Sequence, residues 1–180
     1  MKTLYFVTSN DNKFEEAQMA LPGINLERID IDIDEIQSDD IVQIAKAKAQ
    51  AAYLSCGKPV LVEDSGFYID ALGGFPGPLV KFVEKAMGMD GILRLLGDDK
   101  NRAAQARAVV VYYDGEETLI GVGELEGIIS HTIKGDSGFF FDYFFIPNGY
   151  KKTCAELGLE LKTTFSHRTR AFKDLLDKLG

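Results

Sequence analysis

VLVEDSGFYIDALGGFPGPLVKF, the stretch from Val60 to Phe82, contains the residues that most strongly indicate the fold class. It begins with the apolar run Val60-Leu61-Val62, which has the composition of a buried strand. Glu63 and Asp64 end that run, and Ser65-Gly66 follows them. Because open α/β sheets bind ligands at the carboxyl ends of strands, the two acids indicate a ligand site. An ordinary turn with solvated acids explains the stretch equally well when it is taken alone.

The segment that follows these acids predicts a loop and then two helices. Ala71 to Pro78 contains too much glycine and proline for a helix or a strand. Leu79 to Met87 and Gly91 to Leu96 have the spacing of two short helices, interrupted at Gly88.

The N-terminal region predicts a strand, a polar loop and a helix. Thr3 to Val7 is apolar, and a helical pattern ends near Leu21, before Pro22-Gly23. The loop between them, Thr8 to Lys13, places hydroxyl and amide groups and a lysine at a helix start, which is an anion-binding geometry. It lacks the glycines of a Walker A loop. A plain N-cap with a surface lysine remains the alternative.

A second lysine stands on the apolar face of a predicted helix. Asp39 or Asp40 caps this helix, which runs to about Leu54. At 100° per residue Lys48 falls within the apolar stripe and Lys46 on the opposite face. Lys48 either extends along its stem to water or is directed at a buried anion.

Two further regions predict strands. Asn25 to Ile33 alternates apolar and polar residues, and most acids in and after it should be solvated, although one at the strand exit can reach a metal. Arg102 to Tyr113 and Glu117 to Ile129 predict strands joined by the turn Asp114-Gly115, with glycine-marked bends in the second.

The C-terminal third combines aromatic residues with cations. Gly135 to Pro147 contains five phenylalanines, and an acid among them, Asp142, suits a pocket for a flat aromatic base. Lys162, His167 and Arg168 gather near the start of a last helix that Ser166 caps. These groups suggest a polar ligand, and a surface cluster is the alternative.

Composition limits the class of protein. A chain of 180 residues without a dividing linker predicts one domain, 1–180, and a net charge of −8 argues against nucleic-acid binding. No apolar run is long enough to span a membrane, and no signal peptide is expected. Cys56 and Cys154 indicate free thiols in a reducing cytoplasm, and with only two histidines a zinc site is not expected.

Motifs along nearly the whole chain resemble those of one known family, the inosine triphosphate pyrophosphatases, which hydrolyse deaminated purine nucleoside triphosphates. The loop from Pro76 to Lys81 is closer to the archaeal and eukaryotic branch than to the bacterial one. The motifs that carry the resemblance are Thr8-Ser9-Asn10-x-x-Lys13, Glu63-Asp64-Ser65-Gly66, Ala71-Leu72-x-Gly74-x-Pro76-Gly77, Gly138-Phe139-x-x-Asp142, Thr153-x-Ala155-Glu156 and Ser166-His167-Arg168-x-Arg170-Ala171.

The resemblance implies a fold and a reaction. The fold is α/β, with an elongated, curved mixed β-sheet, two α/β lobes and an active-site cleft between them. The reaction is Mg²⁺-dependent cleavage of ITP, dITP or XTP between the α and β phosphates, which gives the monophosphate and pyrophosphate. A homodimer is also implied.

The resemblance further implies roles for individual residues. Asp64 activates water, Glu35 and Asp64 face the metal, and Lys48 contacts phosphate. The expected substrate-binding residues are Thr8, Ser9, Asn10, Asp11, Asn12, Lys13 and Ser65 for the phosphates and their surroundings, and Phe139, Phe140, Phe141, Asp142, Lys162, His167 and Arg168 for base and sugar.

Elementary chemistry agrees with these roles. Mg²⁺ prefers carboxylate oxygens, waters and phosphates, which fits scattered acids better than histidines. A pocket that accepts hypoxanthine or xanthine must read the 6-oxo group with donors, and Lys162, His167 and Arg168 supply them.

The departures from the family pattern fall in the base-binding loop. The family usually has glycine and then Tyr or Trp before the acid, with Pro after it, whereas this chain has Phe140, Phe141 and Tyr143. Thr163 stands where an asparagine usually follows the lysine. Phe141 can still stack on a base, and the ranking of the bases stays open.

Three other classes of protein differ from this interpretation in identifiable residues. A pyrophosphatase for modified pyrimidines should lack the Ser166-His167-Arg168 end. A sensor that binds nucleotide without turnover does not need Lys13, Lys48 and Asp64 together, and a structural protein does not need a lysine on an apolar helix face.

Overall fold

A computed structural model describes residues 3–179 of the chain. Its centre is a seven-stranded mixed sheet in the order β2-β1-β3-β5-β6-β7, with β4 paired to β3. Strands β2, β1 and β3 are parallel, and the other pairs are antiparallel. The strands are β1 (Thr3–Val7), β2 (Asn25–Ile29), β3 (Val60–Ile69), β4 (Pro76–Gly77), β5 (Ala103–Tyr113), β6 (Thr118–Ile129) and β7 (Phe145–Pro147).

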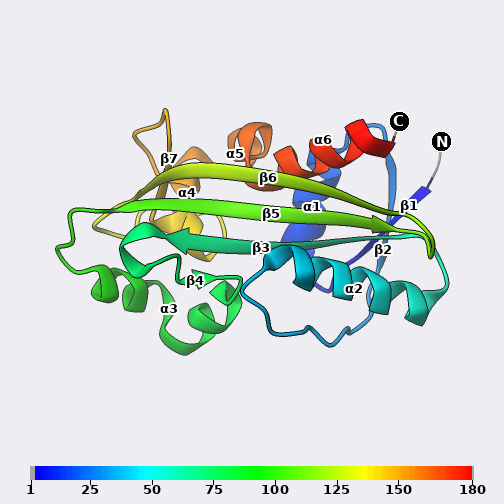
Figure 1. Cartoon of the computed structure of the whole chain (residues 1–180). Helices are drawn as coiled ribbons and strands as arrows, with labels where there is room; N and C mark the ends of the chain where they lie inside the picture. Colours follow the sequence, from blue (N-terminus) through cyan, green and yellow to red (C-terminus); the bar gives the residue numbers. More distant parts are fainter. Residues whose placement is uncertain (1–2, 180) are drawn as a thin grey trace.

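The helices cover the sheet unevenly along its length. Figure 1 shows α2 in front of the sheet and α1 behind it at one end, with α3 at the other end. None of the helices in residues 3–179 is long and apolar enough to cross a membrane. The helices are α1 (Asp11–Ala20), α2 (Ile41–Cys56), α3 (Val80–Leu96), α4 (Cys154–Leu157), α5 (Leu159–Phe165) and α6 (His167–Leu179), with 3₁₀ turns η1 (Asp70–Leu72) and η2 (Phe140–Tyr143).

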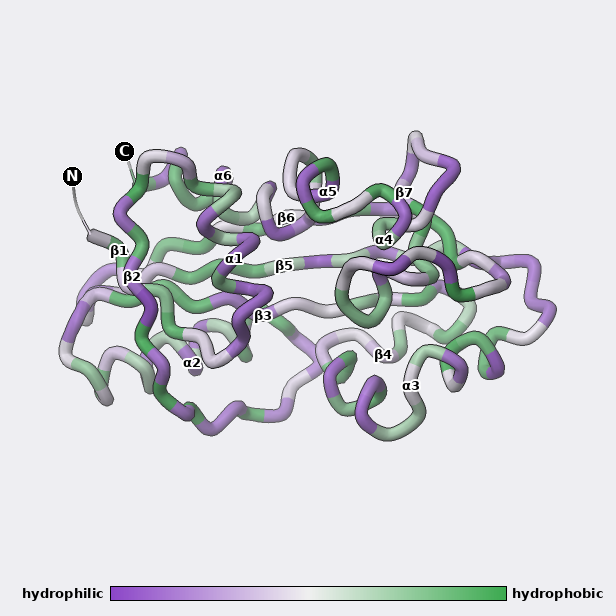
Figure 2. The backbone as a smooth tube through the Cα atoms, turned by 180° about the vertical axis from the view of Figure 1, so that it is seen from behind, coloured by the Kyte–Doolittle hydropathy of each residue, from purple (hydrophilic) through white to green (hydrophobic). Residues whose placement is uncertain are grey.

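Alternation along β3 divides the core between the two faces of the sheet. Val60 and Val62 pack with α2 on one face, while Leu61 packs with α1 and α6 on the other. Because side chains of a strand alternate, the neighbours Glu63 and Asp64 point to opposite faces. Figure 2 views the molecule from the side of α1. Glu63 points to this face, where it pairs with Lys13 of α1.

Helix α6 lies unusually close to β6 because two glycines leave room for it. A Cβ at Gly121 would lie 2.1 Å from the carbonyl oxygen of Ala171, and one at Gly123 would lie 2.0 Å from that of His167. The predicted second hairpin strand is confirmed, and these two glycines allow a backbone to approach it. They bring the first residues of α6 against the sheet.

A third apolar cluster fills the other end of the molecule. Phe67 and Ile69 of β3 pack there with α3 and the phenylalanines around η2. Gly88 has φ 62° and ψ −171° and interrupts α3, so the predicted break between two helical segments is confirmed. The mixed, elongated α/β sheet expected from the sequence is therefore the architecture of the chain.

Three boundaries differ from the prediction. β3 continues to Ile69, so Glu63 and Asp64 lie in its middle and not at its end, because β5 pairs with it throughout. β2 ends at Ile29 and not at Ile33. The segment 71–78 is not wholly loop, since it includes the end of η1 and the two-residue strand β4.

Candidate active site

Lys48, Glu35 and Asp64 form an ion-pair cluster on the α2 face of the sheet. Lys48 Nζ lies 2.7 Å from Glu35 Oε1 and 3.1 Å from Asp64 Oδ1. Lys46, two residues earlier on α2, is exposed. The helical phase predicted for the two lysines is therefore confirmed, and Lys48 is directed at the buried Asp64 and the more exposed Glu35.

Burial and mutual interactions shift the pKa values of all three groups. Burial raises the pKa of the Asp64 carboxyl, and the neighbouring Lys48 ammonium opposes that shift. Burial also disfavours the charged forms of Glu35 and Lys48. Their mutual hydrogen bond and attraction outweigh it for Glu35, and attraction by Asp64 together with the Glu35 hydrogen bond outweighs it for Lys48. The pKa of Glu35 is lowered and the pKa of Lys48 is raised. The ionised forms of Glu35 and Lys48 are therefore favoured, whereas burial favours the neutral form of Asp64.

The donor set suits a hard divalent cation, although it is incomplete. Asp64 Oδ2 is buried and has no hydrogen-bond partner, so it is free to accept a ligand. Two carboxylates are a typical protein contribution to a Mg²⁺ site, in which water and phosphate supply the remaining oxygens. No cluster of three or more His, Cys, Asp or Glu that could hold an ion occurs within residues 3–179.

On the opposite face, Glu63 joins two cations that come from distant parts of the chain. Its Oε2 lies 2.7 Å from Lys13 Nζ, and its Oε1 lies 3.2 Å from Arg168 Nε. Lys13 also donates to the Glu63 carbonyl oxygen at 3.2 Å. Although burial opposes ionisation, Arg168 and Lys13 lower the pKa of Glu63 to about 2.

Glu16 extends this network toward the C-terminal region. Its carboxylate accepts a hydrogen bond from Arg168 and lies 3.2 Å from Lys162 Nζ. Burial opposes its charge, but Arg168 and Lys162 lower the pKa of Glu16 to about 2. Lys162 Nζ also lies 2.7 Å from Asp142 Oδ2. Three buried acids thus pair with three cations: Glu16, Glu63 and Asp142 with Lys13, Lys162 and Arg168.

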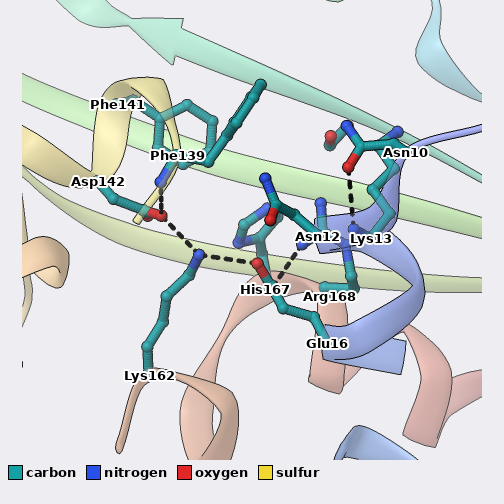
Figure 3. A pocket seen from close by; sticks show the side chains of 11 residues that line it. Asn10, Asn12, Lys13, Glu16, Phe139, Phe141, Asp142, Lys162, His167 and Arg168 are labelled. Atoms are coloured by element: carbon teal, nitrogen blue, oxygen red, sulfur yellow. Dashed lines mark hydrogen bonds and ion pairs between the residues drawn. The ribbon is translucent and has the colours of Figure 1, made fainter. Parts of the chain in front are cut away.

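A pocket opens beside this network, and Figure 3 shows its side chains. Phe139, on its wall, is 37% exposed, whereas Phe141 is buried and stacks on Phe67 with ring centroids 4.6 Å apart. Phe139 is therefore the ring that retains a free face. The pocket is lined by Asn10, Asn12, Lys13, Glu16, Ser65, Phe139, Phe141, Asp142, Lys162, His167 and Arg168.

His167 brings an uncharged polar group to the same wall. Its ring is buried, and neither ring nitrogen has a hydrogen-bond partner. Burial, with Arg168 and Lys162 nearby, lowers the pKa of His167 to about 3, so the imidazole is neutral near pH 7. A neutral ring offers one donor and one acceptor. The sequence prediction treated His167 as a donor only.

Ser65 connects the two faces of the site. It lines the pocket just described and also a second hollow that contains Glu35 and Asp64. The pocket with the aromatic wall and the carboxylate pair are therefore adjacent, separated by one residue of β3. This places an aromatic-lined binding region next to a candidate reaction centre.

Not every predicted site residue reaches these hollows. Phe140 packs edge-on against Phe144 in the core and does not line the aromatic pocket, so its contact with substrate stays a prediction. Its φ of 30° lies in the left-handed region, which accounts for the glycine usual in the family at this position. Asp142 already has hydrogen-bond partners within the protein, since its Oδ2 accepts from the Phe139 N–H and from Lys162 Nζ.

The N-terminal loop is organised mainly by its own hydrogen bonds. Asn10 caps α1 by accepting from the backbone N–H of Lys13, and Thr8 Oγ1 accepts from the N–H of Asn10. Ser9 is exposed, and Asp11 pairs with Arg28 at 2.5 Å. Thr8, Ser9 and Asp11 do not line the aromatic pocket, whereas Asn10, Asn12 and Lys13 do.

The fold and these two adjoining hollows define a class: an α/β protein with an aromatic-lined pocket beside a carboxylate–lysine centre. Comparison with known proteins is more specific. A sequence model of the Ham1 family matches residues 4–178. The chain belongs to the Ham1 family.

Individual relatives agree with this assignment. A dITP/XTP pyrophosphatase of Methanopyrus kandleri is 44% identical over 96% of this chain and 93% of its own length. One of Saccharolobus solfataricus is 42% identical over 92% and 88%. A solved Ham1 protein from Coxiella burnetii superposes with a TM-score of 0.88 at 29% identity, covering 99% of this chain and 98% of its own.

Proposed function

We propose that the protein hydrolyses deaminated purine nucleoside triphosphates, ITP, dITP and XTP, to the monophosphate and pyrophosphate. The names of relatives at 42–44% identity support this reaction. The observation that carries it is the adjacency, across Ser65, of the aromatic pocket and the Asp64–Lys48–Glu35 cluster. A base in the pocket would leave the phosphates near the carboxylates.

The chemistry assigned to the cluster is an in-line displacement at phosphorus. Asp64 orients the attacking water and accepts its proton, and Lys48 neutralises charge on the phosphate oxygens. Glu35 and Asp64 would hold Mg²⁺, which when bound supplies further charge neutralisation. The unpartnered Oδ2 of Asp64 is the atom available for water or metal.

The triphosphate is assigned to the start of α1. The N-terminal N–H groups and dipole of this helix favour an anion, and Lys13 adds a flexible cation. Ser65, on the neighbouring strand, would touch the same phosphates. Thr8, Ser9, Asn10, Asp11 and Asn12 complete this proposed loop, although Thr8 and Asn10 act largely through its internal hydrogen bonds.

The base is assigned to the pocket wall made by Phe139, Phe141, Asp142, Lys162, His167 and Arg168. Phe139 has the free face needed for stacking. The cations and the neutral His167 would donate to the 6-oxo group of hypoxanthine or xanthine. Adenine carries a donor at that position, so the donors would stay unpaired against it and ATP should be disfavoured.

The proposal also covers the oligomeric state, the compartment and the partners of the enzyme. We propose that it works as a homodimer in the cytoplasm, with a small-molecule substrate and without nucleic acid or membrane as a partner. The net charge of −8 supports the absence of a nucleic-acid partner.

A nucleoside triphosphate panel tests the function. Pyrophosphate and orthophosphate are assayed separately for ITP, dITP, XTP, GTP and ATP. We expect pyrophosphate as the product, and kcat/KM for ITP and XTP well above that for GTP and ATP. Comparable efficiency on ATP and ITP would refute the preference for deaminated bases, while binding without turnover would identify a nucleotide sensor.

A further inference from the structure

Lys48 lies where a metal ion would be expected, between two carboxylates. Its Nζ contacts Glu35 Oε1 at 2.7 Å and Asp64 Oδ1 at 3.1 Å. The three groups come from separate parts of the chain: α2, the irregular segment before it, and β3. The side chain of Lys48 is 15% exposed, so this ammonium is held in the cluster rather than in water.

The cluster is poorly suited to a divalent ion while Lys48 stays in place. Within residues 3–179 no third acid, histidine or cysteine joins Glu35 and Asp64 to form a metal-holding group. Mg²⁺ requires close to six oxygen ligands, and the ammonium would repel it at short range. Yet Asp64 Oδ2 is buried and unpartnered, so one acceptor remains unused.

A bound triphosphate would remove both obstacles. Its oxygens supply ligands for the ion, and they offer the lysine another anionic partner within reach of its flexible stem. Resting on the proposed function, we propose that Lys48 occupies the carboxylate pair in the nucleotide-free protein and gives it up to the divalent ion when the triphosphate binds. Lys48 would thus make metal binding conditional on nucleotide.

Mn²⁺ titration of the nucleotide-free protein, followed by the paramagnetic resonance signal of free Mn²⁺, tests this role. Wild type should bind Mn²⁺ weakly, and Lys48→Met should bind it about tenfold more tightly or better, because an adjacent like charge is removed. Lys46→Met removes the same charge from the exposed face of α2 and should match wild type. Lys48→Arg keeps a cation and should match it too.

A double variant tests whether the gained Mn²⁺ affinity depends on the Asp64 carboxylate. Lys48→Met combined with Asp64→Asn should lose the gain, since the ion would have lost a carboxylate ligand. If Lys48→Met does not fold, Lys48→Gln removes the same charge and replaces it in the series. Equal Mn²⁺ affinity of wild type and the uncharged Lys48 variants, or an equal gain in Lys46→Met, would overturn the proposal.

The titration is independent of turnover. Failure of ITP to release pyrophosphate would refute the proposed function and would leave the Mn²⁺ result interpretable. Conversely, normal ITP hydrolysis with no gain of Mn²⁺ affinity in Lys48→Met would overturn only the exchange of Lys48 for the ion.

Discussion

The two faces of β3 carry charge clusters of opposite character. On the face of α1 and α6, Glu63 belongs to a network in which buried acids and cations balance. On the face of α2, Asp64 shares one lysine with Glu35 and keeps an unpartnered oxygen. Asp142 Oδ1 in the first network is also buried and unpartnered, but every acid there has a cation partner and acids and cations are equal in number. We therefore call the first cluster closed and the second, whose two acids share one lysine, open.

This difference assigns different tasks to the two clusters. A network whose charges are already paired holds its side chains in place before a ligand arrives, which suits recognition. A cluster with an unused acceptor can take up water, metal or phosphate, which suits chemistry. Substitutions that neutralise one acid at a time should separate the two tasks.

The largest effect is expected on the open face, at Asp64. Asp64→Asn removes the carboxylate that accepts the proton of water, so kcat for ITP should fall by about 10²–10⁴-fold. The fold should persist, because the amide retains the size of the side chain. Steady-state pyrophosphate release measures kcat, and thermal unfolding of the same sample measures the stability of the variant. Turnover near the wild-type rate would remove Asp64 from the reaction.

On the closed face the main effect should be on stability. Glu63→Gln leaves Arg168 and Lys13 without a shared buried anion, and breaking a buried pair costs about 3–5 kcal/mol. Urea unfolding at neutral pH measures this loss. Glu35→Gln is the matched control, because the Glu35 side chain is 34% exposed and its loss should cost far less.

The pH dependence of unfolding tests whether the negative charge of Glu63 stabilises the fold. The folded pKa of about 2 at Glu63 lies below its ordinary value of 4.5. Its contribution is therefore complete above about pH 4.5 and is lost as the pH falls toward 2. The stability difference between wild type and Glu63→Gln should shrink over this range. A constant difference would mean that the charge of Glu63 is not what stabilises the fold.

A smaller effect is expected for the lysine of the open cluster. Lys48→Met keeps the apolar stem and removes the ammonium, so binding of a non-hydrolysable ITP analogue should weaken by about 1–3 kcal/mol. Lys46→Met should leave binding unchanged. Calorimetric titration of both variants measures this, and equal losses would exclude a phosphate role for Lys48.

The sequence predicted the features that depend on local periodicity. The phase of α2 placed Lys48 inward and Lys46 outward because helical spacing is regular over one short segment. The hairpin at Asp114-Gly115 was predicted from its turn residues for the same reason. Both are properties of neighbouring residues, so no knowledge of distant contacts was needed.

Features that depend on distant partners were missed. Glu16 was not predicted as part of the site, although it pairs with Lys162, 146 residues further along the chain. A buried cation cluster requires buried acids, so three cations in one predicted pocket were a signal to search for them. The length of β3 was likewise missed, because it depends on pairing with β5, which follows it by more than thirty residues.

The smallest effect is expected at the exposed edge of the open cluster. Glu35→Gln removes one proposed metal ligand but leaves Asp64, water and phosphate oxygens, so the Mg²⁺ concentration for half-maximal rate should rise by about tenfold or less. The kcat at saturating Mg²⁺ should stay near wild type, because Glu35 does not accept the proton in the proposed reaction. Asp32→Asn changes an exposed acid of the same segment and is the comparison, and its Mg²⁺ requirement should be unchanged. Titration of Mg²⁺ at fixed ITP gives both parameters. If Asp32→Asn raised the requirement and Glu35→Gln did not, the second carboxylate of the centre would be Asp32, and the position that Lys48 occupies would not be that of the metal.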